Sequence, residues 1–152
     1  MRSVVLLTAL VAVGVSATPL CASSLDDQPV DAQTIAALEA RAEQAQPREQ
    51  CFLYAQIVHQ MTELSMREYS AGNLDHATSL LKRIQSIAQK IHLSIAGNDK
   101  RLKNAEILLS HTAFRLNELL HSSGYDDRQL VQETLSQVNH AQTEAMMTVF
   151  QK

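Results

Sequence analysis

The chain has 152 residues, of which 45% are hydrophobic and 19% are charged, as is usual for a folded globular protein of one domain. Aromatic residues make up only 4%, with no Trp, four Gly and three Pro, which argues against a small β-sandwich or barrel. The net charge of −3 is too weak to indicate nucleic-acid binding through overall electrostatics. The composition therefore predicts an all-α domain that does not bind nucleic acid.

The first 22 residues are predicted to be a signal peptide. Arg2 precedes an apolar run at 4–15, which is too short for a membrane-spanning helix of roughly 20 residues. Small residues follow, so cleavage is expected after Ala17 or Ala22. Lipidation of Cys21 would need a small residue directly before it, and Leu20 stands there instead, so lipidation is not expected. We therefore expect an exported, periplasmic or extracellular protein that does not span the membrane after cleavage.

The predicted cleavage site decides which cysteines remain. Cleavage after Ala17 leaves Cys21 and Cys51, which could pair in an oxidising compartment, whereas cleavage after Ala22 leaves Cys51 alone. In neither case do the cysteines form a disulfide framework, so the fold must depend on its apolar core. A flexible leader is expected at 23–30 and a single helical domain at 31–152.

The glycines at 72, 97 and 124 divide this domain into helices of similar length. Each lies between apolar-periodic segments, next to residues that cap helices, as Gly does at a helix C-terminus. Near Gly124, Asp126 and Gln129 resemble a capping box. The predicted helices are about 23 residues and about 35 Å long, and they cover 48–71, 74–96, 99–121 and 127–150.

A shorter, weaker helix is predicted at 31–46, and Pro47 should either kink the chain or break it for one or two residues. Because short turns join helices of equal length, consecutive helices should be antiparallel neighbours. The expected fold is an up-down-up-down four-helix bundle with an extra N-terminal helix. Its broad apolar stripes suit a bundle better than a dimeric coiled coil. The predicted core positions are Tyr54, Ile57, Met61, Leu64, Leu74, Ala77, Leu81, Ile84, Ala88, Ile91, Ile95, Leu102, Ala105, Leu109, Thr112, Leu116, Leu119, Val131, Leu135, Val138, Gln142, Ala145 and Val149.

The stretch Gly72-Asn73-Leu74-Asp75-His76-Ala77, with Leu81 and Ile84 after it, resembles the turn and second helix of a tetratricopeptide hairpin. The resemblance covers about fifteen residues and does not recur at the 34-residue period of that repeat. It implies a helical hairpin at this point and nothing about function.

The histidines provide one hypothesis for a metal or cofactor site. A di-iron bundle needs a Glu-x-x-His pair on each of two helices, and the chain has one such spacing, Glu118 to His121. The helical periodicity places no histidine on the core-facing seam: His59, His121 and His140 fall at outer positions, His76 and His111 one step off the seam, and His92 on a flank. Replacing His59 by Ala is accordingly predicted to be nearly silent. A metal- or cofactor-binding bundle that uses histidines stays the alternative function.

Catalytic motifs are missing from the sequence. There is no Gly-x-Ser-x-Gly nucleophile turn, no phosphate-binding glycine loop and no Cys-x-x-Cys-His haem attachment motif. Cys51, among Phe52, Leu53 and Tyr54, is expected to be an inert, partly buried thiol. The sequence predicts no enzyme, no catalytic residue and no cofactor.

Charge is distributed unevenly along the chain. Residues 82–103 hold six cations against the single acid Asp99, whereas the leader and first helix are acidic. These cations either form a solvated face, with the acidic segment folded across it, or contact a partner. The predicted partner is an unidentified protein or an anionic envelope component, and the expected function is that of an exported, soluble, non-enzymatic binding or scaffold module. The predicted contact residues are Lys90, Lys100, Arg101 and Lys103.

Overall fold

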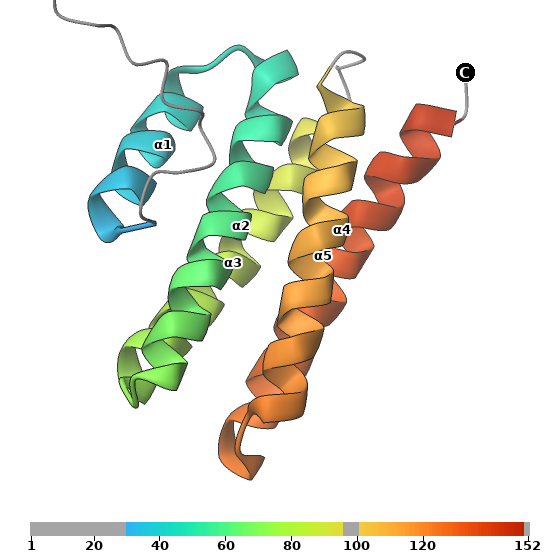
Figure 1. Cartoon of the computed structure of the whole chain (residues 1–152). Coiled ribbons are helices and arrows are strands. Elements are labelled where there is room, and N and C mark those ends of the chain that lie inside the picture. Colours follow the sequence, from blue (N-terminus) through green and yellow to red (C-terminus); the bar gives the residue numbers. More distant parts are fainter. Residues whose placement is uncertain (1–29, 96–100, 151–152) are drawn as a thin grey trace, which may run out of the picture.

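The computed structural model describes residues 30–95 and 101–150, and this part of the chain contains five α-helices and no strand (Figure 1). The all-α bundle predicted from the sequence is confirmed. The predicted signal peptide 1–22 and nearly all of the leader 23–30 lie outside the described residues, as do Cys21, Gly97 and Lys100. The helices are α1 Ala32–Gln44, α2 Pro47–Ser70, α3 Leu74–Ser94, α4 Leu102–Ser122 and α5 Tyr125–Phe150.

Successive helices run in opposite directions, so α2 and α4 are parallel to each other, as are α3 and α5 (Figure 1). Helix α2 packs on α3 and α4, and α5 packs on the same two helices. Within the described residues α3 and α4 do not contact each other, so they occupy a diagonal of the bundle. The expectation that consecutive helices are neighbours therefore holds for α2/α3 and α4/α5 but is wrong for α3/α4. We call the two parallel contacts the α2/α4 seam and the α3/α5 seam.

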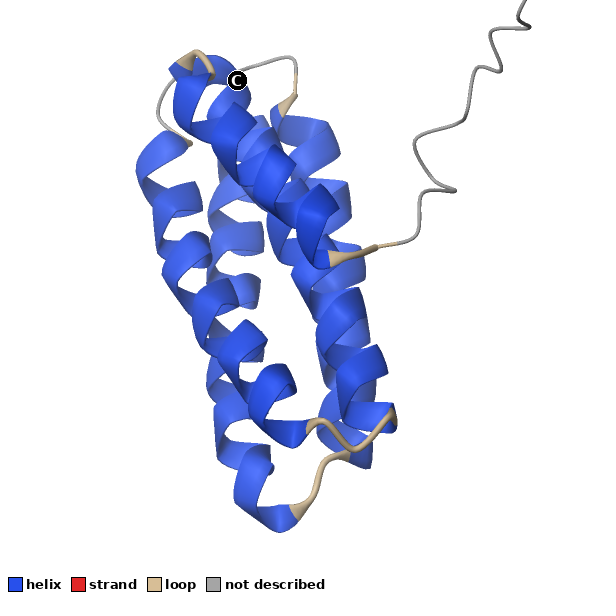
Figure 2. Ribbon diagram, turned by 90° about the vertical axis from the view of Figure 1, so that its left-hand side faces the viewer, coloured by secondary structure: helices blue, strands red, loops and turns tan. Residues whose placement is uncertain are grey.

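Helix α1 lies obliquely across the outside of the bundle and packs antiparallel on α2 (Figure 2). Asp31 caps its first turn, accepting a hydrogen bond from the Thr34 backbone N–H at 2.7 Å. This bond is the main reason that the pKa of Asp31 is lowered from its ordinary value. The helix ends at Gln44, and two extended residues precede Pro47, the first residue of α2. The chain is therefore broken at this junction rather than kinked.

Two turns lie side by side at the end of the bundle opposite this junction (Figure 2). Gly72 ends α2 with a φ of 82°, which favours glycine, as the sequence predicted. Gly124 does not have a positive φ, and α5 begins directly after it at Tyr125. Asp126 consequently lies inside the first helical turn, where its charge suits the helix dipole, and not at the cap position of the expected capping box. The Gly124 N–H donates to the Tyr69 hydroxyl at 2.6 Å and ties the two turns together.

The core runs the length of the bundle and matches most of the predicted stripes. On α5, however, Thr134 and Ala141 are buried in place of Leu135 and Gln142, which are only half-buried. Leu74 is exposed, and Tyr54 and Val149 are half-buried. No helix in the described residues is both long enough and apolar enough to span a membrane.

Candidate functional site

The cations that the sequence singled out lie on both sides of the first turns of α2, because α2 is the helix that separates α3 from α4. Lys90 projects from α3, whereas Arg101 and Lys103 lie at the start of α4. The sequence suggested that these cations share one helical hairpin, but in the described residues the two helices that carry them do not contact each other. Lys100, the fourth predicted contact residue, lies outside the described residues.

Two aromatic rings of α2 support two of these cations. The Lys90 Nζ atom lies 5.8 Å from the centroid of the Tyr54 ring, and the Arg101 Cζ atom lies 5.4 Å from that of the Phe52 ring. Such contacts stabilise exposed cations by about 0.5–1 kcal/mol and leave their N–H groups free to donate. The rings were not predicted as part of the site, although two aromatics within three residues are unusual in so aromatic-poor a chain.

In the described residues, carboxylates pair with only some of the cations of residues 82–103. Arg83 on α3 bonds Glu39 on α1 at 2.7 Å, so the acidic N-terminal helix does cover this cation. Lys90, Arg101 and Lys103 form no ion pair with a described carboxylate. We call these three residues the basic surface.

A hollow of about 580 Å³ lies between α1, α2 and α4, next to the basic surface. Thr34, Ala37, Leu38 and Arg41 of α1 form one wall. The residues that complete its lining are Phe52, Gln56, Gln60, Arg101 and Asn104. The lining thus contains two guanidinium groups and no carboxylate, and sequence reasoning did not find it because it depends on how α1 lies across α2 and α4.

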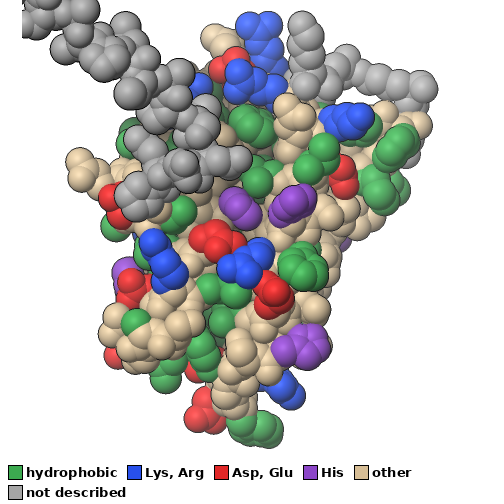
Figure 3. Space-filling model, in the orientation of Figure 1, with side chains coloured by type: hydrophobic (Ala, Val, Ile, Leu, Met, Phe, Trp, Pro, Cys, Tyr) green, Lys and Arg blue, Asp and Glu red, His purple; other side chains and the backbone are tan. Residues whose placement is uncertain are grey.

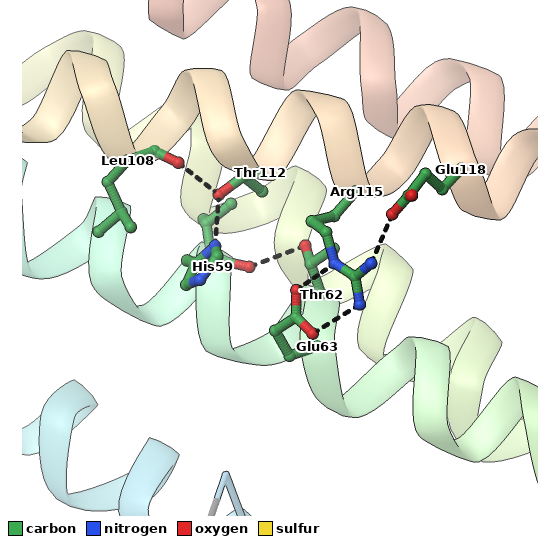
Figure 4. Close-up of polar contacts among 8 residues, drawn as sticks. His59, Thr62, Glu63, Leu108, Thr112, Arg115 and Glu118 are labelled. Atoms are coloured by element: carbon green, nitrogen blue, oxygen red, sulfur yellow. Dashed lines mark hydrogen bonds and ion pairs between the residues drawn. The ribbon is translucent and has the colours of Figure 1, made fainter. Parts of the chain in front are cut away.

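Ionic contacts cross the α2/α4 seam on the face shown in Figure 3, where acidic, basic and histidine side chains stand close together. Arg115 donates from Nε and Nη2 to both carboxylate oxygens of Glu63, at 2.6 and 3.0 Å, and from Nη1 to Glu118 (Figure 4). The hydrogen bonds that Glu63 accepts from Arg115 hold the pKa of Glu63 below its ordinary value, and the bonds that Arg115 donates to Glu63 and Glu118 raise the pKa of Arg115. Glu118 therefore serves an ion pair and does not act with His121, whose Nδ1 lies 2.7 Å from the Asn117 carbonyl oxygen.

His59 lies in this seam and not at an outer position as predicted. Its Nδ1 is 3.1 Å from the hydroxyl of buried Thr112, which donates its own proton to the Leu108 carbonyl at 2.8 Å (Figure 4). With the Thr112 proton on the Leu108 carbonyl, the Thr112 oxygen accepts from His59 in the tautomer that carries its proton on Nδ1. The histidine is half-buried and joins the two helices.

The α3/α5 seam contains a second histidine arrangement. Glu144 lies 2.6 Å from Nδ1 of His92 and 3.7 Å from Nδ1 of His140, and the two imidazole rings are 6.2 Å apart. The two histidines line a groove of about 450 Å³, and the other residues of its lining are Ala88, Gln89, Leu93, Gln137 and Ala141. In the described residues, no group of three or more His, Cys, Asp or Glu residues is arranged to hold a metal ion.

Cys51 is completely buried. Burial raises the pKa of its thiol to about 11, even though a hydrogen bond with Ser94 acts in the opposite direction. Because the thiolate is the reactive form, this side chain is inert at neutral pH. It is more deeply buried than the sequence suggested.

Comparisons of the chain with protein-family models, with curated proteins and with solved structures find no match.

Proposed function

We propose that this chain is an exported, soluble, non-enzymatic binding module that contacts an anionic partner through the basic surface. The observation that carries the proposal is the pair of cations resting on Tyr54 and Phe52 without a described carboxylate partner. Export is supported by the signal-like pattern of residues 1–22. The partner is an envelope component or a protein with an acidic patch.

The chemistry of the basic surface favours reversible binding. Lys90 and Arg101 are each held on one side by a ring, which restricts their motion before the partner arrives and reduces the entropy lost on binding. The charges remain at the surface, however, where salt screens them over about 8 Å at physiological ionic strength. The contact should therefore be weak and should decrease as salt is added.

Charge reversal tests the proposal. A triple variant, Lys90→Glu, Arg101→Glu and Lys103→Glu, should lose binding to vesicles of phosphatidylglycerol and phosphatidylcholine, or to a partner that co-purifies from the native host, while its helical circular dichroism is kept. The matched control reverses Arg67, Lys82 and Arg128, which are exposed and are not part of the basic surface. Equal binding by the triple variant and the wild type would show that the basic surface is only a solvated face.

Two measurements on protein from the native host test the rest of the proposal. N-terminal sequencing should find a chain that begins near Thr18 or Ser23, and an intact Met1 in a cytosolic fraction would contradict export. Elemental analysis and an absorption spectrum test the competing histidine-based function. A stoichiometric metal or a chromophore would favour that alternative over a binding module.

A further inference from the structure

The hollow between α1, α2 and α4 combines features that suit one class of ligand. We propose that it binds a small anion that carries hydroxyl groups, such as a hydroxylated carboxylate or sugar phosphate. This inference goes beyond the proposed function, because it concerns a small ligand in the hollow, which shares only Arg101 with the basic surface. The volume of the hollow, about 580 Å³, lies within the usual range of small-molecule sites, about 300–1,000 Å³.

Two arginines supply the charge. Arg41 comes from α1 and Arg101 from the start of α4, so the anion would bind between two elements that are far apart in the sequence. Neither guanidinium forms an ion pair with a carboxylate in the described part of the chain. The Phe52 ring supports Arg101 at 5.4 Å and leaves its N–H edge free for the bidentate bonds that guanidinium makes with carboxylate and phosphate.

The uncharged lining explains why hydroxyl groups should accompany the anion. The Oε1 atom of Gln60 is buried and lacks a hydrogen-bond partner among the described residues. A buried acceptor without a donor is unfavourable, so a ligand hydroxyl that reaches this oxygen and donates to it would be stabilising. Gln56 and Asn104 add further amide groups, while Leu38 provides an apolar wall.

The groove in the α3/α5 seam provides the internal comparison. It also has a buried glutamine oxygen without a described partner, Oε1 of Gln137, but it has no arginine, and the Glu144 carboxylate lies beside it. A carboxylate repels an anion, so the same ligand should not bind there. The arginine pair is what distinguishes the proposed site.

The inference can be tested by calorimetry on the purified protein with D-glucuronate and glucose 6-phosphate as anionic probes. D-Glucose is the neutral match, and cyclohexanecarboxylate is the anion without hydroxyl groups. At least one anionic sugar should bind saturably and about tenfold or more tightly than glucose, as expected for a charge-assisted contact. Saturation by only one of the two would decide between carboxylate and phosphate. If neither binds saturably to the wild type, the inference is wrong.

Variants locate the binding. Arg41→Gln should weaken binding of the anionic sugar about tenfold, while Arg128→Gln, at the opposite end of the bundle, should not change it. Gln60→Leu should reduce the preference for the anionic sugar over cyclohexanecarboxylate. Equal binding by Arg41→Gln and the wild type, with both folded by circular dichroism, would overturn the assignment.

A double variant, Lys90→Glu with Lys103→Glu, separates this inference from the proposed function because it leaves every residue of the hollow intact. Retained sugar binding by the double variant supports the hollow as the site of the small anion. If the wild type binds the anionic sugar but neither vesicles nor a host partner, the proposed contact at the basic surface fails and the hollow stands. If it binds vesicles but neither anionic sugar, the hollow is wrong and the proposed function stands.

Discussion

The two parallel seams of the bundle join equivalent helices in different ways. In the α2/α4 seam, half-buried side chains bridge the helices, with Arg115 holding both oxygens of Glu63 and His59 bonding buried Thr112. In the α3/α5 seam, the ionic contacts are more exposed, and a groove remains above Ala88 and Ala141. Long side chains fill the first seam, whereas small ones leave space in the second.

The comparison predicts that geometry and burial, more than the number of ionic contacts, decide how much a seam stabilises the fold. The basic partners differ, since the His92 side chain is 56% exposed and that of Arg115 37%. The carboxylates of Glu144 and Glu63 are similarly buried, with 24% and 27% of the side chain exposed. Exposed ion pairs contribute little because water and salt screen them, while a bidentate pair in a partly buried position contributes more. The seams should therefore differ in their response to mutation, acid and salt.

The largest effect is expected in the core. Ile84 on α3 is completely buried, and Ile84→Asp would place an unpaired charge there, which should cost more than about 4 kcal/mol and unfold the protein. Far-ultraviolet circular dichroism checks this. Ser86→Asp, an exposed change on the same helix, should keep the helical spectrum. A folded Ile84→Asp variant would mean that the packing of this core is wrong.

The second prediction concerns the Glu63–Arg115 pair. Arg115→Gln should lower the free energy of unfolding by about 1 kcal/mol at neutral pH, a value reduced from that of a buried pair because both groups are partly exposed. Urea denaturation checks it. If the free energy of unfolding changes no more than on loss of an isolated surface charge, the ion pair of the α2/α4 seam is no stronger than those of the α3/α5 seam.

The same pair should produce acid sensitivity. Glu63 has its ordinary pKa of 4.5 in the unfolded chain and a lower one when folded, so the unfolded state binds more protons between these values. The stabilisation is therefore complete above about pH 4.5 and is lost as the pH falls through the folded pKa. Denaturation from pH 7 to pH 3 should show a smaller acid-induced loss in Glu63→Gln than in the wild type. Identical slopes would show that Glu63 does not contribute.

The fourth prediction concerns His59, whose replacement should cost about as much as that of Arg115. Its position on the helix predicted that His59→Ala would be nearly silent, but its bond to Thr112 changes that expectation. The variant should lose about 1 kcal/mol, the usual contribution of one hydrogen bond. A double-mutant cycle with Thr112→Val would isolate the coupling between the two side chains. A coupling energy near zero would mean that the His59–Thr112 contact does not stabilise the fold, as the sequence predicted for a histidine at an outer position.

The smallest effect is expected in the α3/α5 seam. Glu144→Gln removes contacts to exposed His92 and His140 and should change the free energy of unfolding by less than about 0.5 kcal/mol. Urea melts at low and high salt would measure it, with the difference shrinking further at high salt. A loss as large as that for Arg115→Gln would show that the ionic contacts of the two seams stabilise the fold equally.

The local features of this fold were accessible from the sequence, and the long-range ones were not. Apolar periodicity located the helices, and Gly72 marked the end of α2. The buried face of α5 was misplaced because Thr134 and Ala141 carry little hydrophobic signal, yet they pack inward. Small or weakly apolar residues at close helix contacts are hard to recognise from hydropathy alone.

The candidate site was predicted only in part for a related reason. Lys90, Arg101 and Lys103 stood out as local charge, but their aromatic partners and the hollow depend on α3 and α4 lying on either side of α2. Short turns suggested that α3 and α4 were neighbours. Connection length limits how far apart two helix ends lie, but it does not determine which helices pack side by side.

The diagonal placement of α3 and α4 also has a consequence for the order of folding. Contacts within α2/α3 and α4/α5 are local in sequence, whereas the side-chain bonds that cross the two seams in the described residues join residues 49–53 positions apart. Closing such long loops costs entropy before any contact compensates for it. The two hairpins are therefore expected to form early and to dock late, so that Arg115→Gln speeds unfolding more than it slows refolding, which stopped-flow kinetics would measure. A nascent chain would then expose the inner face of its α2/α3 hairpin until α5 had been made.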